Sequence, residues 1–364
     1  MRTFYYGLIL FIVSITVACK QSGPIEDKLL TYVGPNGVLQ EVKSEEDWKV
    51  KRLQILDRLE LAMGGLPDTS NLPPMDIQYR DSLKTDTYTR YTISFTPAEN
   101  EDVTAYLYVP LFKRQGMKHA AMLVLHGTGD LGKRLVDGES PYANRAVAKE
   151  LADRGYVVIA PDYPSMGEQK DYDFGNDRYE SGTMKGIFNH IRCVDLLSTR
   201  SDVDPERIGV IGHSLGGHNS MFLAAFDTRL KVTVSSCGWT LFDYDNLEED
   251  SLYTERYGGR LGDWAKDTYM PLLRTRYELD PQKIPFDFDE VIAAIAPRAF
   301  FSNSPKYDSD FNVEGVMKGI NNVSPVYGLF NSQRDLKVLY PEAEHDFPPD
   351  VKLKAYQFID KILK

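Results

Sequence analysis

The residues 208–217, Ile-Gly-Val-Ile-Gly-His-Ser-Leu-Gly-Gly, constrain the fold of this chain more than any other segment. An apolar, β-branched run ends at Gly212, and a helix-compatible run begins at His218. A Gly-x-Ser-x-Gly sequence between a strand and a helix is typical of a sharp turn that lifts the serine hydroxyl above the sheet edge. Gly212 and Gly216 suit such a turn because a Cβ at either position would crowd it. We therefore interpret Ser214 as a nucleophile; the alternative is a plain glycine-rich turn.

A serine nucleophile needs a histidine base, and the order of residues along the chain restricts the choice. In this strand–turn–helix architecture the partners follow as serine, acid, histidine. Only His218 and His345 come after Ser214, and His218 leaves no room for an acid before it. His345 follows the strand-like residues 336–340, so it is the predicted base. The alternative is a solvated loop histidine.

The acid of the triad is expected after the strand that precedes His345. Residues 297–304 have the apolar character of a buried strand, and Asp308 and Asp310 follow it. We favour Asp308 because it lies nearer the strand end, and therefore nearer the sheet edge where the serine projects. The other carboxylate is then a solvated loop residue or the cap of a helix that starts near Val313.

Two backbone amides are expected to bind the oxyanion of an acyl-transfer reaction. One is the N–H of Leu215, directly after the nucleophile. The second belongs in a loop after an early strand, and residues 126–129 follow the apolar run 121–125. We predict Thr128 N–H for this role, with Gly127 as the next choice.

Together these residues resemble the α/β-hydrolases, nearer the dienelactone hydrolase and acetyl xylan esterase-like branches than the lipases. The matching segments span roughly residues 85–364 and are His126-Gly127, 154–163, 203–217, 296–298 and 345–347. The resemblance implies hydrolysis of an ester or related acyl bond without a cofactor. Many members carry Gly-x-x-Asp after the acid strand, whereas this chain has Ser304-Pro305-Lys306-Tyr307-Asp308. Dienelactone hydrolases proper use cysteine, so Ser214 favours an oxygen ester.

The rest of the chain predicts an α/β fold in a domain over residues 44–364. After residue 116, strand-like and helix-like segments alternate, which favours a mostly parallel, doubly wound sheet. A capping box over residues 44–47 predicts an N-terminal helix, whose apolar stripe is Leu53, Leu56, Leu59 and Met63. Alternating residues in 89–95 and 103–109 predict an antiparallel strand pair.

Residues 239–285, here called the cap insertion, interrupt this alternation and are rich in aromatic residues. They stand between a strand-like run and the acid strand, where this fold often carries a cap. Their aromatic residues suit stacking on sugar rings or aromatic acyl groups, and the alternative is a small satellite core in which they pack. These aromatic residues are Trp239, Phe242, Tyr244, Tyr253, Tyr257, Trp264, Tyr269 and Tyr277.

The N-terminus predicts export. Residues 1–18 have a positive start and an apolar stretch that is short for a membrane span but suits a signal peptide. The sequence Val17-Ala18-Cys19 resembles a bacterial lipoprotein processing site, so Cys19 is the expected lipidated residue. Residues 19–43 are then expected to form a polar tether, and we predict secretion across the inner membrane as a periplasmic or cell-envelope lipoprotein. The alternative is an ordinary signal cleaved nearby.

The composition of the chain limits the classes of partner that we expect it to bind. The formal net charge is −11 and no Lys/Arg cluster stands out, which argues against nucleic acid and leaves a lipid anchor as the only expected membrane contact. Cys193 and Cys237 provide no disulfide framework and are expected as buried thiols. No Cys/His cluster has metal-ligand spacing, so we expect neither metal nor cofactor.

These observations predict a serine esterase that acts on a small ester or an acylated oligosaccharide, most simply by removing short acyl groups from polysaccharide fragments. One alternative is a serine peptidase of the prolyl-oligopeptidase type, which shares the catalytic layout but usually needs a large propeller. The other is a non-catalytic carbohydrate-binding protein of the same fold. The sequence leaves the acyl group, the alcohol and the oligomeric state open.

Overall fold

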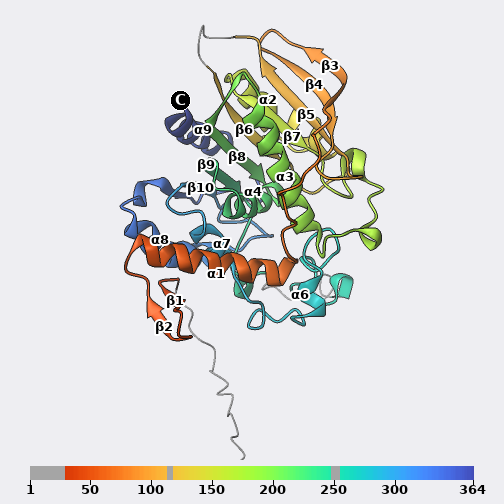
Figure 1. The fold of residues 1–364 in the computed structure, drawn as a ribbon. Helices are drawn as coiled ribbons and strands as arrows, with labels where there is room; N and C mark the ends of the chain where they lie inside the picture. The colour runs from red at the N-terminus through yellow and green to blue at the C-terminus, as the bar shows by residue number, and fades with distance from the viewer. Residues whose placement is uncertain (1–28, 113–117, 247–254) are drawn as a thin grey trace, which may run out of the picture.

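A nine-stranded sheet forms the centre of the computed structural model, which describes residues 29–112, 118–246 and 255–364 (Figure 1). Six neighbouring strands, from β11 to β7, are parallel, and β5, β4 and β3 extend the sheet with antiparallel pairing. This mostly parallel sheet confirms the predicted α/β class and the predicted antiparallel pair. In spatial order the strands are β11 (Leu336–Leu339), β10 (Ala299–Asn303), β9 (Leu230–Ser236), β8 (Val203–His213), β6 (His119–Leu125), β7 (Val157–Pro161), β5 (Val103–Pro110), β4 (Tyr88–Phe95) and β3 (Gln78–Lys84).

Helices cover both faces of the sheet, because side chains of a buried strand alternate between the faces. In β6, Leu123 and Leu125 point to one face and Met122 and Val124 to the other, and all four are buried. The first face packs against α1, α3, α4, α7 and α8, and the second against α2 and α9. The helices are α1 (Glu45–Met63), α2 (Val147–Asp153), α3 (Gly182–Thr199), α4 (Leu215–Phe226), α6 (Leu272–Thr275), α7 (Phe288–Ala293), α8 (Val313–Leu329) and α9 (Pro349–Leu363).

The parallel strands end at one edge of the sheet, and the loops that follow them carry the predicted site residues. This carboxyl edge is where open α/β sheets bind their ligands. Short 3₁₀ turns occupy several of these loops and connections. They are η1 (Gly132–Asp137), η2 (Gly167–Gln169), η3 (Phe174–Asn176), η4 (Phe242–Tyr244) and η5 (Gln333–Asp335).

The N-terminal helix confirms one prediction and corrects another. Ser44 and Asp47 form the predicted capping box at the start of α1. The predicted apolar stripe is wrong at Leu53, which is 59% exposed, because the helix instead buries Trp48 and Ile55 against the sheet layer. The register of a helix face depends on what packs against it, which the periodicity of leucines alone did not reveal.

Part of the segment expected to be a tether is ordered. Strands β1 (Thr31–Val33) and β2 (Leu39–Glu41) form a hairpin that lies against α1. The Gln54 side chain of α1 bonds the backbone N–H and C=O of Val33, at 3.0 and 2.7 Å. Each strand of the hairpin has only three residues, too few to show the apolar alternation that predicts a strand.

Most aromatic residues of the cap insertion that the structure describes are core residues. Trp239 and Phe242 are each 1% exposed, and Trp264 and Tyr269 are also buried. Trp264 stacks on His218 of α4, with 4.6 Å between ring centroids. For these four side chains the packing alternative holds, because the insertion shares the main hydrophobic cluster instead of standing apart.

The export prediction falls on residues 1–18 and Cys19, which lie outside the described residues. Within the described residues, no helix has the length and apolar character needed to cross a membrane. Cys193 and Cys237 are buried and are not joined in a disulfide, as predicted.

Candidate active site

Ser214 occupies the sharp turn that the sequence predicted. Its backbone has φ +57° and ψ −126°, in a region that non-glycine residues rarely adopt. A Cβ on Gly212 would lie 2.2 Å from the backbone of Gly216, and one on Gly216 would lie 2.0 Å from the carbonyl oxygen of Leu125. The turn therefore needs glycine at both positions. It holds the half-buried Ser214 between the end of β8 and the N-terminus of α4.

The loop after β6 and the start of α4 carry the two amides predicted to bind an oxyanion. Within the described residues, the N–H groups of Thr128 and Leu215 donate to no acceptor of the protein. The loop after β6 also comes close to the serine, since a Cβ on Gly127 would lie 3.5 Å from Ser214 Cβ. Free amides beside a serine hydroxyl are the groups that stabilise a developing oxyanion.

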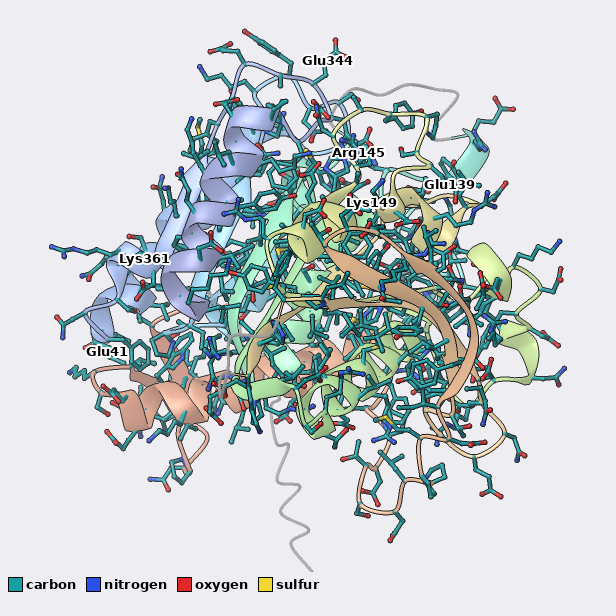
Figure 2. All side chains as sticks on the ribbon, turned by 90° about the horizontal axis from the view of Figure 1, so that it is seen from above. Glu41, Glu139, Arg145, Lys149, Glu344 and Lys361 are labelled. Atoms are coloured by element: carbon teal, nitrogen blue, oxygen red, sulfur yellow. The ribbon has the colours of Figure 1, made fainter. Side chains whose placement is uncertain are left out.

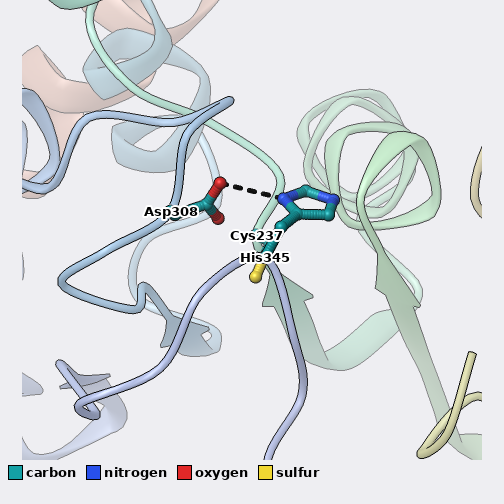
Figure 3. Close-up of side chains that lie close together, drawn as sticks. All are labelled: Cys237, Asp308 and His345. Atoms are coloured by element: carbon teal, nitrogen blue, oxygen red, sulfur yellow. Dashed lines mark hydrogen bonds and ion pairs between the residues drawn. The ribbon is translucent and has the colours of Figure 1, made fainter.

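His345 and Asp308 form a hydrogen-bonded pair at the same sheet edge (Figure 3). The ring Nδ1 of His345 lies 2.9 Å from Asp308 Oδ1. That oxygen also accepts from the backbone N–H groups of Asp310, at 3.0 Å, and Phe311, at 3.2 Å. The Asp310 carboxylate lies farther from Nδ1, at 3.6 Å, and its side chain is 59% exposed. Of the two predicted candidates, Asp308 is thus the buried and better oriented partner.

The imidazole of His345 lies beside the serine turn. Its ring centroid is 4.9 Å from that of His213, the residue before Ser214. The Nδ1 bond to Asp308 leaves Nε2 available for a second partner. In the described part of the chain, no hydrogen bond joins the Ser214 hydroxyl to His345, and such contacts are often long before substrate binds.

The surroundings of His345 favour its protonated form. Burial lowers the pKa of this imidazole, but the hydrogen bond and the charge of Asp308 outweigh burial and leave the pKa raised above its usual value. Asp310 adds to the increase and Arg145 opposes it. An imidazole with a raised pKa is a stronger base once it has lost its proton, which suits proton abstraction from a serine.

Contacts that the sequence did not reveal fix the His345 loop. Arg145, just before α2, reaches the carboxylate of Asp346 at 2.7 Å and the carbonyl oxygen of His345 at 3.1 Å. The Asn144 side chain donates to the other oxygen of Asp346, at 3.0 Å. Figure 2 labels Arg145 and Glu344, the neighbour of His345 in the sequence, both in the upper part of the view. Phe311 stacks on the His345 ring, with 5.9 Å between centroids.

Cys237, at the end of β9, completes a cluster with Asp308 and His345 (Figure 3). Potential metal-ligating atoms of these three residues lie within 4.8 Å of one another, which their spacing in the sequence did not reveal. Burial and the nearby Asp308 raise the pKa of the Cys237 thiol well above its usual value, and its sulfur lies 3.2 Å from the carbonyl oxygen of Asp346. His345 Nδ1 and Asp308 Oδ1 already bond each other at 2.9 Å, so we assign the cluster to the environment of the Asp308–His345 pair.

The chain is similar in sequence to several known proteins. Residues 142–279, which include Ser214, match the prolyl oligopeptidase family. The protein YtaP of Bacillus subtilis, named as a hydrolase, is 27% identical over 278 residues, which cover 72% of this chain and 85% of YtaP. Carbohydrate esterase MZ0003, from an unknown prokaryotic organism, is 26% identical over 208 residues, which cover 52% of this chain and 46% of that protein.

The fold also matches solved structures over almost its whole length. A glucuronoyl esterase from Solibacter usitatus superposes with a TM-score of 0.68 and 17% sequence identity, covering 91% of this chain and 96% of that one. The chain therefore has the α/β-hydrolase fold that its motifs predicted.

Proposed function

We propose that this protein is a serine esterase with Ser214 as nucleophile, His345 as base and Asp308 as the acid that orients the base. The observation that carries the proposal is the meeting of three features at one sheet edge. A strained serine turn, unbonded amides and a carboxylate–imidazole pair come from strands β6, β8, β10 and β11. Packing alone does not call for a strained serine beside an imidazole with a raised pKa.

The reaction follows from these positions. Ser214 Oγ attacks the ester carbonyl carbon while His345 Nε2 takes the hydroxyl proton. The amides of Leu215 and Thr128 bind the oxyanion of the tetrahedral intermediate. The alcohol leaves with the proton from His345, and the acyl group stays on Ser214. Water, activated by His345, then cleaves that acyl-enzyme, releases the carboxylic acid and restores the serine.

We propose a carbohydrate ester as the substrate. The names of MZ0003 and of the Solibacter esterase support this class, and the short acyl preference rests on the sequence. Two orientations of the ester fit the same chemistry. In an acetylated sugar the carbohydrate is the alcohol, whereas in a uronate ester it is the acyl part. We favour the first, a small acyl group on a sugar alcohol.

The catalytic assignment is tested by covalent labelling. A serine-directed fluorophosphonate is expected to label the wild-type protein at Ser214, and Ser214→Ala is expected to lower kcat by roughly 10⁴-fold or more. Mass spectrometry of the labelled peptide identifies the site. Full labelling and full activity of the Ser214→Ala protein contradict the assignment, and wild-type protein that neither reacts nor hydrolyses any ester favours a non-catalytic carbohydrate-binding role.

The substrate class is tested with a panel of matched compounds. Acetylated xylo-oligosaccharides, a methyl glucuronate ester and p-nitrophenyl esters of increasing chain length separate the ester classes. A proline-containing peptide p-nitroanilide tests the peptidase alternative, which the family match over residues 142–279 favours. We expect the highest kcat/KM on an acetylated oligosaccharide and a maximum at acetate or propionate among the simple esters. A maximum at octanoate, or faster cleavage of the peptide, contradicts this substrate class.

We also propose that Cys19 carries lipid and holds the enzyme at the cell envelope. The support is the sequence Val17-Ala18-Cys19 behind an apolar segment. The full-length protein is expected to partition into detergent, and Cys19→Ala to release it into the soluble fraction. A soluble wild type whose N-terminus begins elsewhere contradicts the lipid anchor.

A further inference from the structure

Residues 267–269 of the cap insertion lie close to both residues whose amides are proposed to bind the oxyanion. The Tyr269 hydroxyl shares a hydrogen bond of 2.9 Å with Thr128 Oγ1. The preceding residue, Thr268, lines a small cavity of about 10 Å³ together with Leu215. The cap insertion therefore reaches the two residues whose amides are proposed to bind the oxyanion, Thr128 and Leu215.

This segment is itself firmly held. The backbone N–H of Gly182 donates to the carbonyl oxygen of Asp267 at 2.9 Å, and that of Thr183 donates to Tyr269 at 3.0 Å. A Cβ on Gly182 would lie 2.4 Å from the Thr268 carbonyl oxygen, so the two backbones are in close contact. The first turn of α3 therefore holds residues 267–269 in place through these backbone contacts.

Tyr269 is a buried residue whose hydroxyl bonds the exposed Thr128. Its side chain is 6% exposed, and burial raises its pKa to about 12, so the hydroxyl keeps its proton at neutral pH. Thr128 lies in the loop after β6 and is exposed. Within the described residues, its hydroxyl has no hydrogen-bond partner other than Tyr269. The tyrosine is therefore the polar contact that fixes the orientation of this loop residue.

We infer that Tyr269 is a positioning residue, which holds Thr128 so that its amide points at the oxyanion. This inference rests on the proposed function. Oxyanion donors act over about 2.7–3.1 Å, and a displacement of about 1 Å costs up to about 10²-fold in rate. The cap insertion, through one hydroxyl, thereby sets the geometry of the catalytic edge.

The test removes the hydrogen bond from either side. Tyr269→Phe keeps the ring and loses the hydroxyl, and we expect kcat to fall about 10-fold with KM changed less than about 2-fold. Thr128→Val is expected to match it, whereas Thr128→Ser, which keeps the hydroxyl, retains most of the rate. The double variant Tyr269→Phe/Thr128→Val is expected to be no slower than either single variant, because both remove one interaction.

Tyr277→Phe is the matched control. Tyr277 lies in the same insertion, and its hydroxyl donates to the carbonyl oxygen of Leu61 at 3.1 Å, away from the oxyanion loop. We expect this control to leave kcat unchanged. A wild-type kcat in Tyr269→Phe, a change confined to KM, or additive losses in the double variant each overturn the inference. If Ser214→Ala is inactive in the same assay, the proposed function survives that result; if it stays active, both fail.

Discussion

Two histidine environments in this molecule show how the proposed catalytic imidazole differs from buried imidazoles that only pack. His345 stands on a loop at the carboxyl edge, half-buried, with a carboxylate on Nδ1. His190 in α3 and His218 in α4 are buried, and none of their ring nitrogens has a hydrogen-bond partner in the described residues. His218 instead packs between Trp264 and Phe222, at 4.6 Å from each ring.

The pKa values of these histidines are shifted in opposite directions, and the difference in their partners explains this. Burial lowers the pKa of His190 and of His218 to about 3, because no negative group compensates for the loss of water. At His345 burial also lowers the pKa, but Asp308 reverses the effect. The residue type is the same in both environments, so the partner and the access to solvent decide whether a histidine can exchange protons near neutral pH.

The largest expected effect tests directly the difference between His345 and the buried His218. His345→Ala is expected to lower kcat by roughly 10⁴-fold or more, as removal of a triad base does. His218→Phe replaces a neutral buried ring with an apolar one and is expected to leave kcat within about 3-fold, because this ring only packs. Steady-state kinetics on p-nitrophenyl acetate measure both. A larger loss in His218→Phe than in His345→Ala reverses the assignment.

The second effect separates the two carboxylates beside His345. Asp308→Asn is expected to lower kcat by about 10³- to 10⁴-fold, because the amide favours the wrong imidazole tautomer. Asp310→Asn is expected to cost less than about 10-fold, since that side chain is largely exposed and lies farther from Nδ1. The same kinetic assay compares them. Reversed magnitudes identify Asp310 as the triad acid.

The third effect concerns stability at acid pH. His218 is neutral in the folded protein and titrates near pH 6.5 when unfolded, so the unfolded state binds more protons between pH 6.5 and about 3. The free energy of unfolding therefore falls as the pH drops through this range, by up to about 1.4 kcal/mol per pH unit for this residue. Urea unfolding at pH 7 and pH 5 is expected to show a smaller decrease in His218→Phe than in the wild type. Equal decreases contradict the buried neutral state.

The smallest expected effect concerns how the activity depends on the pKa of His345. Its pKa is raised, so the protonated form persists above pH 6.5 and the acid limb of kcat/KM is expected above that pH. Asp310 contributes part of the increase, so Asp310→Asn is expected to move the limb to lower pH. A pH–rate profile of both proteins measures the shift. If the acid limb of Asp310→Asn stays in place or moves to higher pH, Asp310 does not help to raise the pKa of His345.

The sequence was informative where one segment carries its own constraint. The serine turn needs glycine on both sides, and the order of residues leaves one histidine that fits, so the sequence alone led to Ser214 and His345 as single candidates. Asp308 could only be favoured over Asp310, because the backbone turn that points one carboxylate at Nδ1 depends on the loop packing against the helix that follows. Leu53 shows the same limit in α1, where the apolar face depends on the surface that it meets.

The sequence by itself determined the alternation of strands and helices, the turn at Ser214 and the edge at which the chemistry gathers, because these depend on local patterns and on the direction of parallel strands. Only the tertiary structure decided that most described aromatic residues of the cap insertion pack inward, that Arg145 fixes the His345 loop, and that Tyr269 meets Thr128. These last contacts join residues 141 to 200 positions apart. Such pairs leave no local pattern, since their distance is set by the packing of the whole sheet and its helices.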